Sequence, residues 1–397
     1  MVSYKDKIKI SFVIDRLNFG GAEKLTIQLI NYLDPEIFEK TLIYLFEPQK
    51  DLSFKDKINK DVNIIFFDIL KFRLPEKVSR LNKLLRNSDI VHSCLESSNL
   101  YCSIVNFVYP SDRKFISTVH GIDFPFANDP ELKKLYATSG IKSKFLFKDL
   151  QTYLFKYYSG FISVCNDIKH YLIEKRKIDS KKITVIYHGI DIASDNLPLE
   201  ELNELRKNYS IHNNDYIIGY VGRLAYGKGL EYLLKEFRKF EEKIPNAKLL
   251  IIGDGELREF LTKYVKDNSL VDKVIFTGYQ KNVINYYSLI DVYVIPSFSE
   301  STNLTLLEAM NAGVTAVSSD AGGLKEIIED GINGYLFNVG DFNEMGKKIM
   351  HAYNCRNKSE SIRSNAKKTV LNKFNISNNL PEIQKHILSY IDPHRLF

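Results

Sequence analysis

The chain has 397 residues, of which 44% are hydrophobic and 26% charged, and its formal net charge at pH 7 is +6. This length predicts two domains, and the composition excludes a disordered or fibrous protein. No apolar run approaches the ~18 residues of a membrane span, and the first apolar stretch is typical of a strand instead of a signal peptide. Four cysteines without C-x-x-C spacing favour buried thiols in a reducing compartment, so we expect a cytoplasmic protein.

The first elements alternate between strand and helix. The pattern from Lys9 to Phe46 predicts a strand, a glycine turn, an amphipathic helix and a second strand. Such alternation indicates a βαβ unit in a parallel sheet. The turn contains Gly20 and Gly21, which let the backbone approach a ligand at a helix N-terminus. A tight turn without a ligand is the commoner explanation of a Gly-Gly pair after a strand.

Four more short strands follow in the first half: NIIFF at 63–67, DIVHSC, KFISTVHG and GFISVC. A helix with proline in its first turn is predicted from Pro75 to Asn87. His120 stands at the end of the strand KFISTVHG, where ligands bind in open α/β sheets. A lone histidine is more often structural than functional. The segment KITVIYHGID closes this half.

The positive charge is concentrated in the first half of the chain. Residues 1–190 carry 30 Lys and Arg against 22 Asp and Glu, whereas the remainder carries 25 against 27. We expect an anionic partner, either a membrane surface or a phosphate-bearing acceptor, and no nucleic acid because no binding motif accompanies the charge. The charges gather in a stripe (Lys77, Arg80, Lys83, Arg86) and in a lysine- and aromatic-rich segment that includes Lys142, Phe145, Phe147, Leu150, Leu154, Phe155 and Lys156. The stripe could instead be the solvated face of a helix, and the lysine- and aromatic-rich segment could instead be a helix that packs against the core.

A polar run from Ile192 to Asn214 separates the halves, and we predict domains at 1–195 and 196–397. The second domain begins with the strand DYIIGYVG and a glycine-bearing turn that carries Arg223 and Lys228. Two cations five residues apart at a strand end can both reach one diphosphate. The next predicted strand ends at Gly253, and a further strand is VIFTGY.

The stretch from Asp291 to Phe337 places two carboxylates around a helix start. Its strand stops at Pro296, a polar loop carries Glu300, and Glu308 follows within a helix that begins at Leu304. Backbone N–H groups at such a helix start favour an anion, and carboxylates accept hydrogen bonds from hydroxyls. This combination suits a nucleotide sugar. Two solvated acids near a helix start would be the alternative explanation.

The whole stretch resembles the donor-site signature of glycosyltransferase family 4, the retaining GT-B enzymes. The shared features are two glutamates eight residues apart, Glu-Ala-Met, a Gly-Gly pair followed by Glu326, and Asp-Gly-Ile-Asn-Gly at 330–334. Gly-Arg-Leu-x-x-x-Lys-Gly, Gly-Gly-Ala-Glu, Thr-Val-His-Gly and His-Gly-Ile-Asp also resemble family segments. Ser301 stands where the family usually has glycine, and Thr315 where it usually has proline.

The resemblance implies an α/β protein with the GT-B fold, in which two Rossmann-like domains face each other across a cleft and the last helix crosses back to the first domain. It implies retaining, metal-independent transfer from a nucleotide sugar, with a UDP-sugar favoured, to a glycan or lipid-linked acceptor. No cofactor and no metal ligand set are implied; Asp-x-Asp is absent. The residues so assigned are Glu300 (sugar), Glu308 (ribose), Arg223 and Lys228 (diphosphate), His120 (transferred sugar), Gly21 (diphosphate and acceptor), and Asn303, Leu304 and Gly253 (further substrate contacts).

Two other functions remain open at this stage. A nucleotide-sugar epimerase of the same architecture would bind the donor without a sugar acceptor, and epimerisation in the absence of an acceptor would identify it. A non-catalytic relative would keep the fold to bind another protein. The joint presence of Arg223, Lys228, Glu300 and Glu308 argues against the latter.

Overall fold

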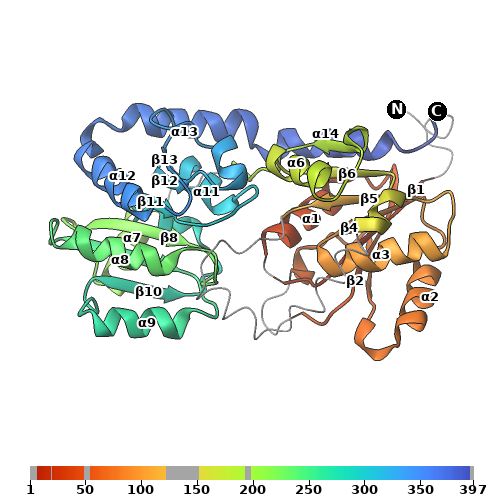
Figure 1. Ribbon diagram of the computed structural model, residues 1–397, viewed down its shortest axis with the longest axis horizontal. Helices are drawn as coiled ribbons and strands as arrows, with labels where there is room; N and C mark the ends of the chain where they lie inside the picture. The colour runs from red at the N-terminus through yellow and green to blue at the C-terminus, as the bar shows by residue number, and fades with distance from the viewer. Residues whose placement is uncertain (1–6, 19, 49–53, 122–151, 193–197, 394–397) are drawn as a thin grey trace. The chain divides into compact units, whose positions relative to one another are not determined.

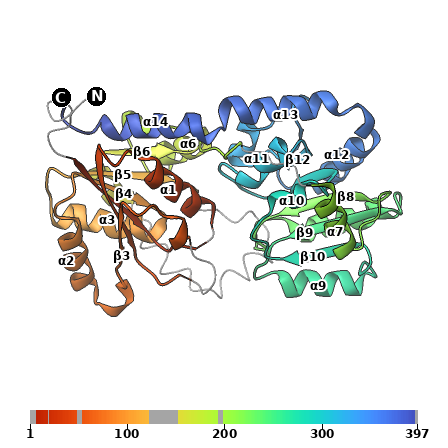
Figure 2. The same cartoon turned by 180° about the vertical axis from the view of Figure 1, so that it is seen from behind.

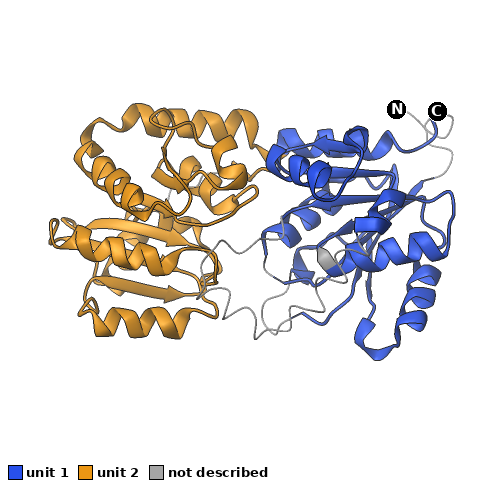
Figure 3. Ribbon diagram, viewed as in Figure 1, with its two compact units in different colours: residues 1–188, 377–397 blue, residues 189–376 orange. Residues whose placement is uncertain are grey.

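The computed structural model describes the chain except for residues 1–6, 19, 49–53, 122–151, 193–197 and 394–397 (Figure 1). The chain divides into two compact units (Figure 3). Unit 1 comprises residues 1–188 and 377–397, and unit 2 comprises residues 189–376. The predicted boundary near residue 195 falls among the residues that are not described. The residues of the last helix from Ser377 onward belong to unit 1.

Unit 1 is built on a parallel seven-stranded sheet in the order β3-β2-β1-β4-β5-β6-β7. Its strands are β1 (Ile8–Ile14), β2 (Phe38–Tyr44), β3 (Val62–Phe66), β4 (Ile90–Cys94), β5 (Lys114–Val119), β6 (Gly160–Ser163) and β7 (Ile183–Val185). Its described helices include α1 (Gly21–Tyr32), α2 (Leu74–Leu85), α3 (Glu96–Val108), α6 (Asn166–Glu174) and α14 (Ile376–Leu388).

The helices of unit 1 cover both faces of this sheet. The connection through α1 runs from β1 towards one edge, and the connection through α3 runs from β4 towards the other. Because parallel crossovers are right-handed, α1 and α3 cover opposite faces (Figures 1 and 2). The predicted inner face of α2 is confirmed, since Val78, Leu81 and Leu85 are buried.

Unit 2 contains a parallel six-stranded sheet in the order β10-β9-β8-β11-β12-β13. Its strands are β8 (Tyr216–Val221), β9 (Ala247–Ile252), β10 (Val274–Gly278), β11 (Val292–Ile295), β12 (Thr315–Ser319) and β13 (Tyr335–Phe337). Its helices are α7 (Leu199–Asn208), α8 (Leu230–Glu241), α9 (Arg258–Asp267), α10 (Ile284–Tyr287), α11 (Leu304–Asn311), α12 (Phe342–Asn354) and α13 (Glu360–Lys373). Helix α8 packs on α12, and α11 packs on α13.

Two sheets of near-continuous apolar strands explain why these sequences fold in this way. Strands β8 and β11 are buried at every residue, as parallel strands covered on both faces must be. The predicted two Rossmann-like domains are therefore confirmed. Helix α7 was not predicted, because it lies in a mostly polar run and none of its residues is buried. Glutamates in its first turn and Arg206 and Lys207 in its last turn complement the helix dipole instead.

Candidate donor site and histidine cluster

The strand order of unit 2 reverses between β8 and β11, which pair with each other at the centre of the sheet. Loops that leave the carboxyl ends of two such strands run in opposite directions and leave a crevice between them, where ligands of α/β proteins bind. The residues predicted for the donor lie at this point. Arg223 and Lys228 follow β8, and Glu300 and Asn303 follow β11.

The loop after β8 depends on glycines for its shape. Gly229, the residue before α8, has a φ of 71°, and a Cβ at this position would lie 2.1 Å from the carbonyl oxygen of Pro296. Only glycine permits this close approach without strain. The contact brings the loop after β8 against the loop after β11, and Phe298 donates its backbone N–H to Gly227 O at 2.9 Å.

An ion pair joins these two loops. Lys228 Nζ lies 2.7 Å from Glu300 Oε1, and the side chains of Lys228 and Glu300 are 25% and 12% exposed. Ser297 Oγ donates to the same carboxylate oxygen at 2.8 Å, and Gly323 donates its backbone N–H to Glu300 O at 3.0 Å. The structure therefore brings together two of the four charged residues predicted for the donor, and it fixes the Glu300 carboxylate from two sides.

The remaining donor residues lie on neighbouring backbone. Arg223 is exposed, and within the described ranges its guanidinium forms no ion pair. Glu308 is half-buried on α11 and accepts a hydrogen bond from Tyr287 Oη at 3.1 Å. Asn303 caps α11: its Oδ1 accepts from Leu306 N and from Thr305 Oγ1, both at 2.8 Å. Leu304 is the first residue of that helix.

Beneath these loops lie two buried tyrosines that sequence reasoning did not identify. Tyr293 Oη donates to Thr305 Oγ1 at 2.7 Å and also lies 3.1 Å from Val221 O. Tyr220 Oη donates to Arg223 O at 3.1 Å. Burial raises the pKa of both phenols well above the ordinary value, so both remain hydrogen-bond donors. Their hydrogen bonds connect the start of α11 and the backbone of Arg223 to the end of β8. In the sequence they could be recognised only as tyrosines within apolar strands.

Gly253 has a structural reason to be glycine. It lies directly after β9 with a φ of 131°, and a Cβ there would lie 2.0 Å from Gly222 O. Its N–H donates to Gly278 O at 2.9 Å. Gly253 therefore lets three strand ends meet next to Arg223.

The unit 1 candidates lie at the corresponding edge of the other sheet. Gly21 is exposed and is the first residue of α1, directly after the β1 loop. His120 follows β5 and is half-buried, and its ring stacks on that of His188 with centroids 5.1 Å apart and planes 19° apart. His92, on β4, is fully buried, with its Nε2 2.7 Å from Thr118 Oγ1. The sequence singled out His120 but not this cluster of three histidines.

Burial keeps these imidazoles neutral. It lowers the pKa of His120 to about 4 and that of His92 to about 3, and it holds the pKa of His188 well below the ordinary value. For His92 and His188 the neighbouring rings add to the effect, because a proton on one ring would be repelled by a proton on another.

The lysine- and aromatic-rich segment of unit 1 is only partly described. Lys142, Phe145, Phe147 and Leu150 lie outside the described residues. Leu154 and Phe155 are 2% and 4% exposed, and Phe155 packs in the core with Tyr158 and Phe161. For these two residues the core alternative is therefore right, and an interfacial role is wrong, because their side chains do not reach the surface.

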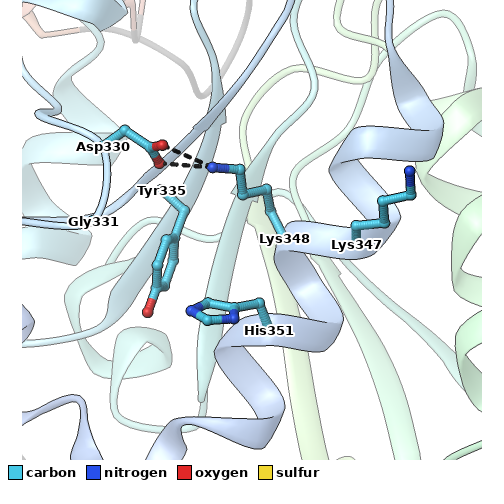
Figure 4. A pocket seen from close by; sticks show the side chains of 6 residues that line it. All are labelled: Asp330, Gly331, Tyr335, Lys347, Lys348 and His351. Atoms are coloured by element: carbon cyan, nitrogen blue, oxygen red, sulfur yellow. Dashed lines mark hydrogen bonds and ion pairs between the residues drawn. The ribbon is translucent and has the colours of Figure 1, made fainter.

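A separate cavity of about 420 Å³ lies on unit 2 between the 330–335 turn and α12 (Figure 4). Asp330 and Lys348 both line it and form an ion pair, with Lys348 Nζ 2.8 and 3.0 Å from the two carboxylate oxygens. Asp330 also accepts from the backbone N–H of Leu336 at 2.8 Å. None of the predicted site residues lines this cavity, so Asp330 of the Asp-Gly-Ile-Asn-Gly motif has a structural role here.

Comparison with known proteins agrees with this geometry. The profile of the family "Glycosyl transferases group 1" matches residues 202–369, and that of "Glycosyltransferase Family 4" matches residues 19–194. The crystal structure of Anabaena Alr3699/HepE in complex with UDP-glucose superposes with a TM-score of 0.80 at 19% identity, over 96% of this chain and all of that one. The two domains thus have the GT-B fold.

Two curated proteins illustrate the sequence similarity. The chain is 34% identical to the uncharacterized glycosyltransferase MJ1607 of Methanocaldococcus jannaschii over 227 residues, which span 55% of this chain and 56% of that protein. It is 24% identical to the UDP-Gal:alpha-D-GlcNAc-diphosphoundecaprenol alpha-1,3-galactosyltransferase of Escherichia coli over 97% of both chains. The chain belongs to the group 1 glycosyltransferases of family 4.

Proposed function

We propose that the protein transfers a sugar, with retention of configuration and without a metal ion, from a UDP-sugar to a glycan or lipid-linked acceptor in cell-surface polysaccharide assembly. The observation that carries this proposal is the Lys228–Glu300 ion pair at the switch point of unit 2, with Arg223 and Glu308 on adjoining backbone. Support for the donor comes from Alr3699/HepE, whose structure contains UDP-glucose, and support for a lipid-linked acceptor comes from the galactosyltransferase of Escherichia coli.

Each charged group has a distinct task in this proposal. Arg223 and Lys228 neutralise the leaving diphosphate, Glu300 accepts hydrogen bonds from the sugar, and Glu308 accepts from the ribose. The bond from the anomeric carbon to the diphosphate breaks, and the acceptor oxygen bonds to that carbon from the same face. The acceptor proton passes to a phosphate oxygen of the leaving group. Preorganised cations aimed at the developing charge stabilise such a transition state.

Lys228 also has to change partner. In the structure its ammonium is neutralised by Glu300, the residue assigned to the sugar. A bound diphosphate would compete for the ammonium, and sugar hydroxyls would replace it on the carboxylate. Donor binding therefore exchanges one charge pair for two ligand contacts and leaves neither charge unpaired.

Product analysis tests this function directly. UDP- and GDP-sugars are incubated with lipid-linked acceptors, the products are identified by mass spectrometry, and the anomeric configuration is determined by NMR. We expect transfer from a UDP-sugar with retention. Lys228→Ala should abolish most of the transfer activity. Lys263→Ala, which removes an exposed lysine on α9, should leave that activity unchanged. Epimerised donor in the absence of any acceptor would instead establish the epimerase alternative, and an inverted product would overturn retention.

We further propose that unit 1 attaches the enzyme to the cytoplasmic face of an anionic membrane through a surface around α2. Leu70 and Leu74 are 71% and 50% exposed where the chain enters α2, next in sequence to the exposed Lys71 and Arg73, and Lys83 and Arg86 are exposed towards the end of the helix. Exposed leucines among lysines and arginines suit a phospholipid surface, where each well-placed cation contributes about 1 kcal/mol. No described helix is both long and apolar enough to span a bilayer.

Vesicle co-sedimentation without acceptor tests the membrane proposal. We expect anionic vesicles to bind more protein than neutral ones, with a steep loss as salt shortens the Debye length below about 10 Å. Lys83→Glu with Arg86→Glu should weaken this binding, whereas Lys263→Glu on unit 2 should not. Equal binding to both vesicle types would contradict the membrane proposal and favour a phosphate-bearing acceptor as the partner of the basic surface.

A further inference from the structure

Three histidines from three different elements meet at the carboxyl edge of the unit 1 sheet. His92 lies within β4, His120 follows β5, and His188 follows β7. The His120 and His188 rings lie nearly parallel at 5.1 Å. The face of His188 therefore covers one face of His120, the only one of the three assigned to the reaction.

His188 does not hold this place through hydrogen bonds of its ring. It is 3% exposed, and within the described part of the chain both ring nitrogens are buried without a hydrogen-bond partner. A neutral imidazole always carries one N–H, and leaving a buried donor unpaired costs about 1–3 kcal/mol. What the His188 ring presents to His120 is therefore its planar face and not a particular nitrogen.

The backbone on either side of His188 is tightly held. Asn379 Nδ2 donates to Tyr187 O, Ile190 N donates to Phe374 O at 2.9 Å, and Ile376 N donates to Ile190 O at 3.0 Å. A Cβ at Gly189 would lie 2.1 Å from Phe374 O, which keeps this approach possible only for glycine. The backbone that carries His188 is therefore held in place, and the ring itself is packed against His120.

Among the described residues, other histidines act electrostatically on the members of this cluster. The groups that act on the pKa of His188 are His120 and His92, and those that act on His92 are His120 and, from α14, His386. Burial lowers the pKa of His120. Removal of the His188 ring would admit water to the covered face of His120 and weaken this effect.

We propose that His188 is a positioning residue: its ring fixes the plane of His120 and excludes water from it, so that a neutral, correctly oriented imidazole faces the sugar or the acceptor during transfer. This inference rests on the proposed function, since it assigns a task to His188 only through His120. His188 itself contacts no substrate in this proposal.

NMR titration of the His120 ring tests the positioning role without any substrate. The histidine Cε1–H signals of the full-length protein are followed from pH 8 to pH 4, and His120 is assigned by its loss in His120→Gln. We expect the wild-type His120 signal to remain that of a neutral ring down to about pH 4. In His188→Ala its pKa should rise towards 6.5, and in His188→Asn, which keeps a flat uncharged cover, it should stay low. An unchanged pKa in His188→Ala, or an equal rise in both variants, overturns the proposal.

Kinetics then show whether the position of His120 matters for transfer. We expect His188→Ala to lower kcat about tenfold, with the acid limb of its pH profile moved upwards, because a misplaced catalytic group costs rate. The donor KM should change little, since the four charged donor residues lie on unit 2, and His188→Asn should restore most of kcat. A rise in donor KM with normal kcat contradicts the proposal. Absence of transfer by the wild-type protein would refute the proposed function alone, because the NMR result is independent of it.

Discussion

The carboxyl edges of the two sheets carry opposite kinds of polar residues. In unit 2 the loops after β8 and β11 bring charged groups together, with the Lys228–Glu300 pair partly open to solvent. In unit 1 the ends of β4, β5 and β7 bring together three imidazoles, two of them buried, that burial keeps uncharged. The topology is the same, and the chemistry differs.

The difference shows what each edge can do in the proposed reaction. A site for a diphosphate needs charged groups held in place, and Lys228 and Glu300 form a partly exposed ion pair. A site that meets a sugar or an acceptor hydroxyl needs groups that donate or accept hydrogen bonds without a net charge, and neutral imidazoles do both. Burial and exposure, not residue type alone, separate the two roles.

The largest expected effect is the loss of the cations in unit 2. Removal of one preorganised charge contact to the leaving diphosphate costs roughly 3 kcal/mol, about a hundredfold in turnover. Arg223→Ala and Lys228→Ala should each lose this much in steady-state kcat, while Lys263→Ala remains normal. Circular dichroism of each variant should show an intact fold. Near-normal turnover in both variants would remove the diphosphate assignment and with it the contrast between the two edges.

The second prediction concerns acid. A histidine whose pKa is lowered on folding is protonated more readily in the unfolded chain, so stability is lost as pH falls through the unfolded value of about 6.5. For His92, with a folded pKa of about 3, the loss between pH 6.5 and pH 4 is about 3 kcal/mol. In unit 2, ion pairs lower the pKa of Asp215 and Asp330, which lose their contribution only at pH values below about 4.

Hydrogen exchange at pH 6.5, 5 and 4, read by mass spectrometry after correction for the intrinsic exchange rate, separates these windows. The β4 and β5 amides of unit 1 should lose protection before the β8 and β11 amides of unit 2. His92→Gln should flatten the pH dependence of unit 1, whereas replacement of the exposed His212 should not. Simultaneous loss in both units would contradict the assignment.

The third prediction separates the two glutamates of unit 2. Glu308→Ala should weaken binding of free UDP by about tenfold to a hundredfold, since a hydrogen bond to a charged group contributes about 1.5–3 kcal/mol. Glu300→Ala should change UDP binding little, because UDP lacks the sugar, although turnover falls. Calorimetry with the bare nucleotide decides between them. Tyr287→Phe, which deletes the hydroxyl that donates to Glu308, should fall between the wild type and Glu308→Ala.

The smallest expected effect is that of chelation. Because Arg223 and Lys228 supply the positive charge for the diphosphate, initial rates with and without EDTA should agree. Rescue by Mg²⁺ or Mn²⁺ of an activity abolished by EDTA would show that the two side chains are insufficient.

The sequence alone determined the two-domain α/β architecture and the donor loops. The apolar runs of β8 and β11 and the glycines around Lys228 are local signals, since strand burial and positive φ are dictated by neighbouring residues. Arg223, Lys228, Glu300 and Glu308 were located in the same way, from their positions just after predicted strands and near predicted helix starts. The predicted roles of these residues rest on the family resemblance and await the experiments above.

Only the tertiary structure decided which of these residues meet. Lys228 and Glu300 are 72 residues apart, and their contact depends on the strand order that places β8 beside β11. His92, His120 and His188 come together because β4 and β5 are adjacent and β7 lies beyond them in the same sheet. Helix α7 forms without a buried residue, and Phe155 is buried in a core that includes residues of strands far away in the sequence. Pairing across a sheet brings together residues that no sequence pattern links. Burial by strands from distant parts of the chain then lowers the pKa of the three histidines and keeps them uncharged.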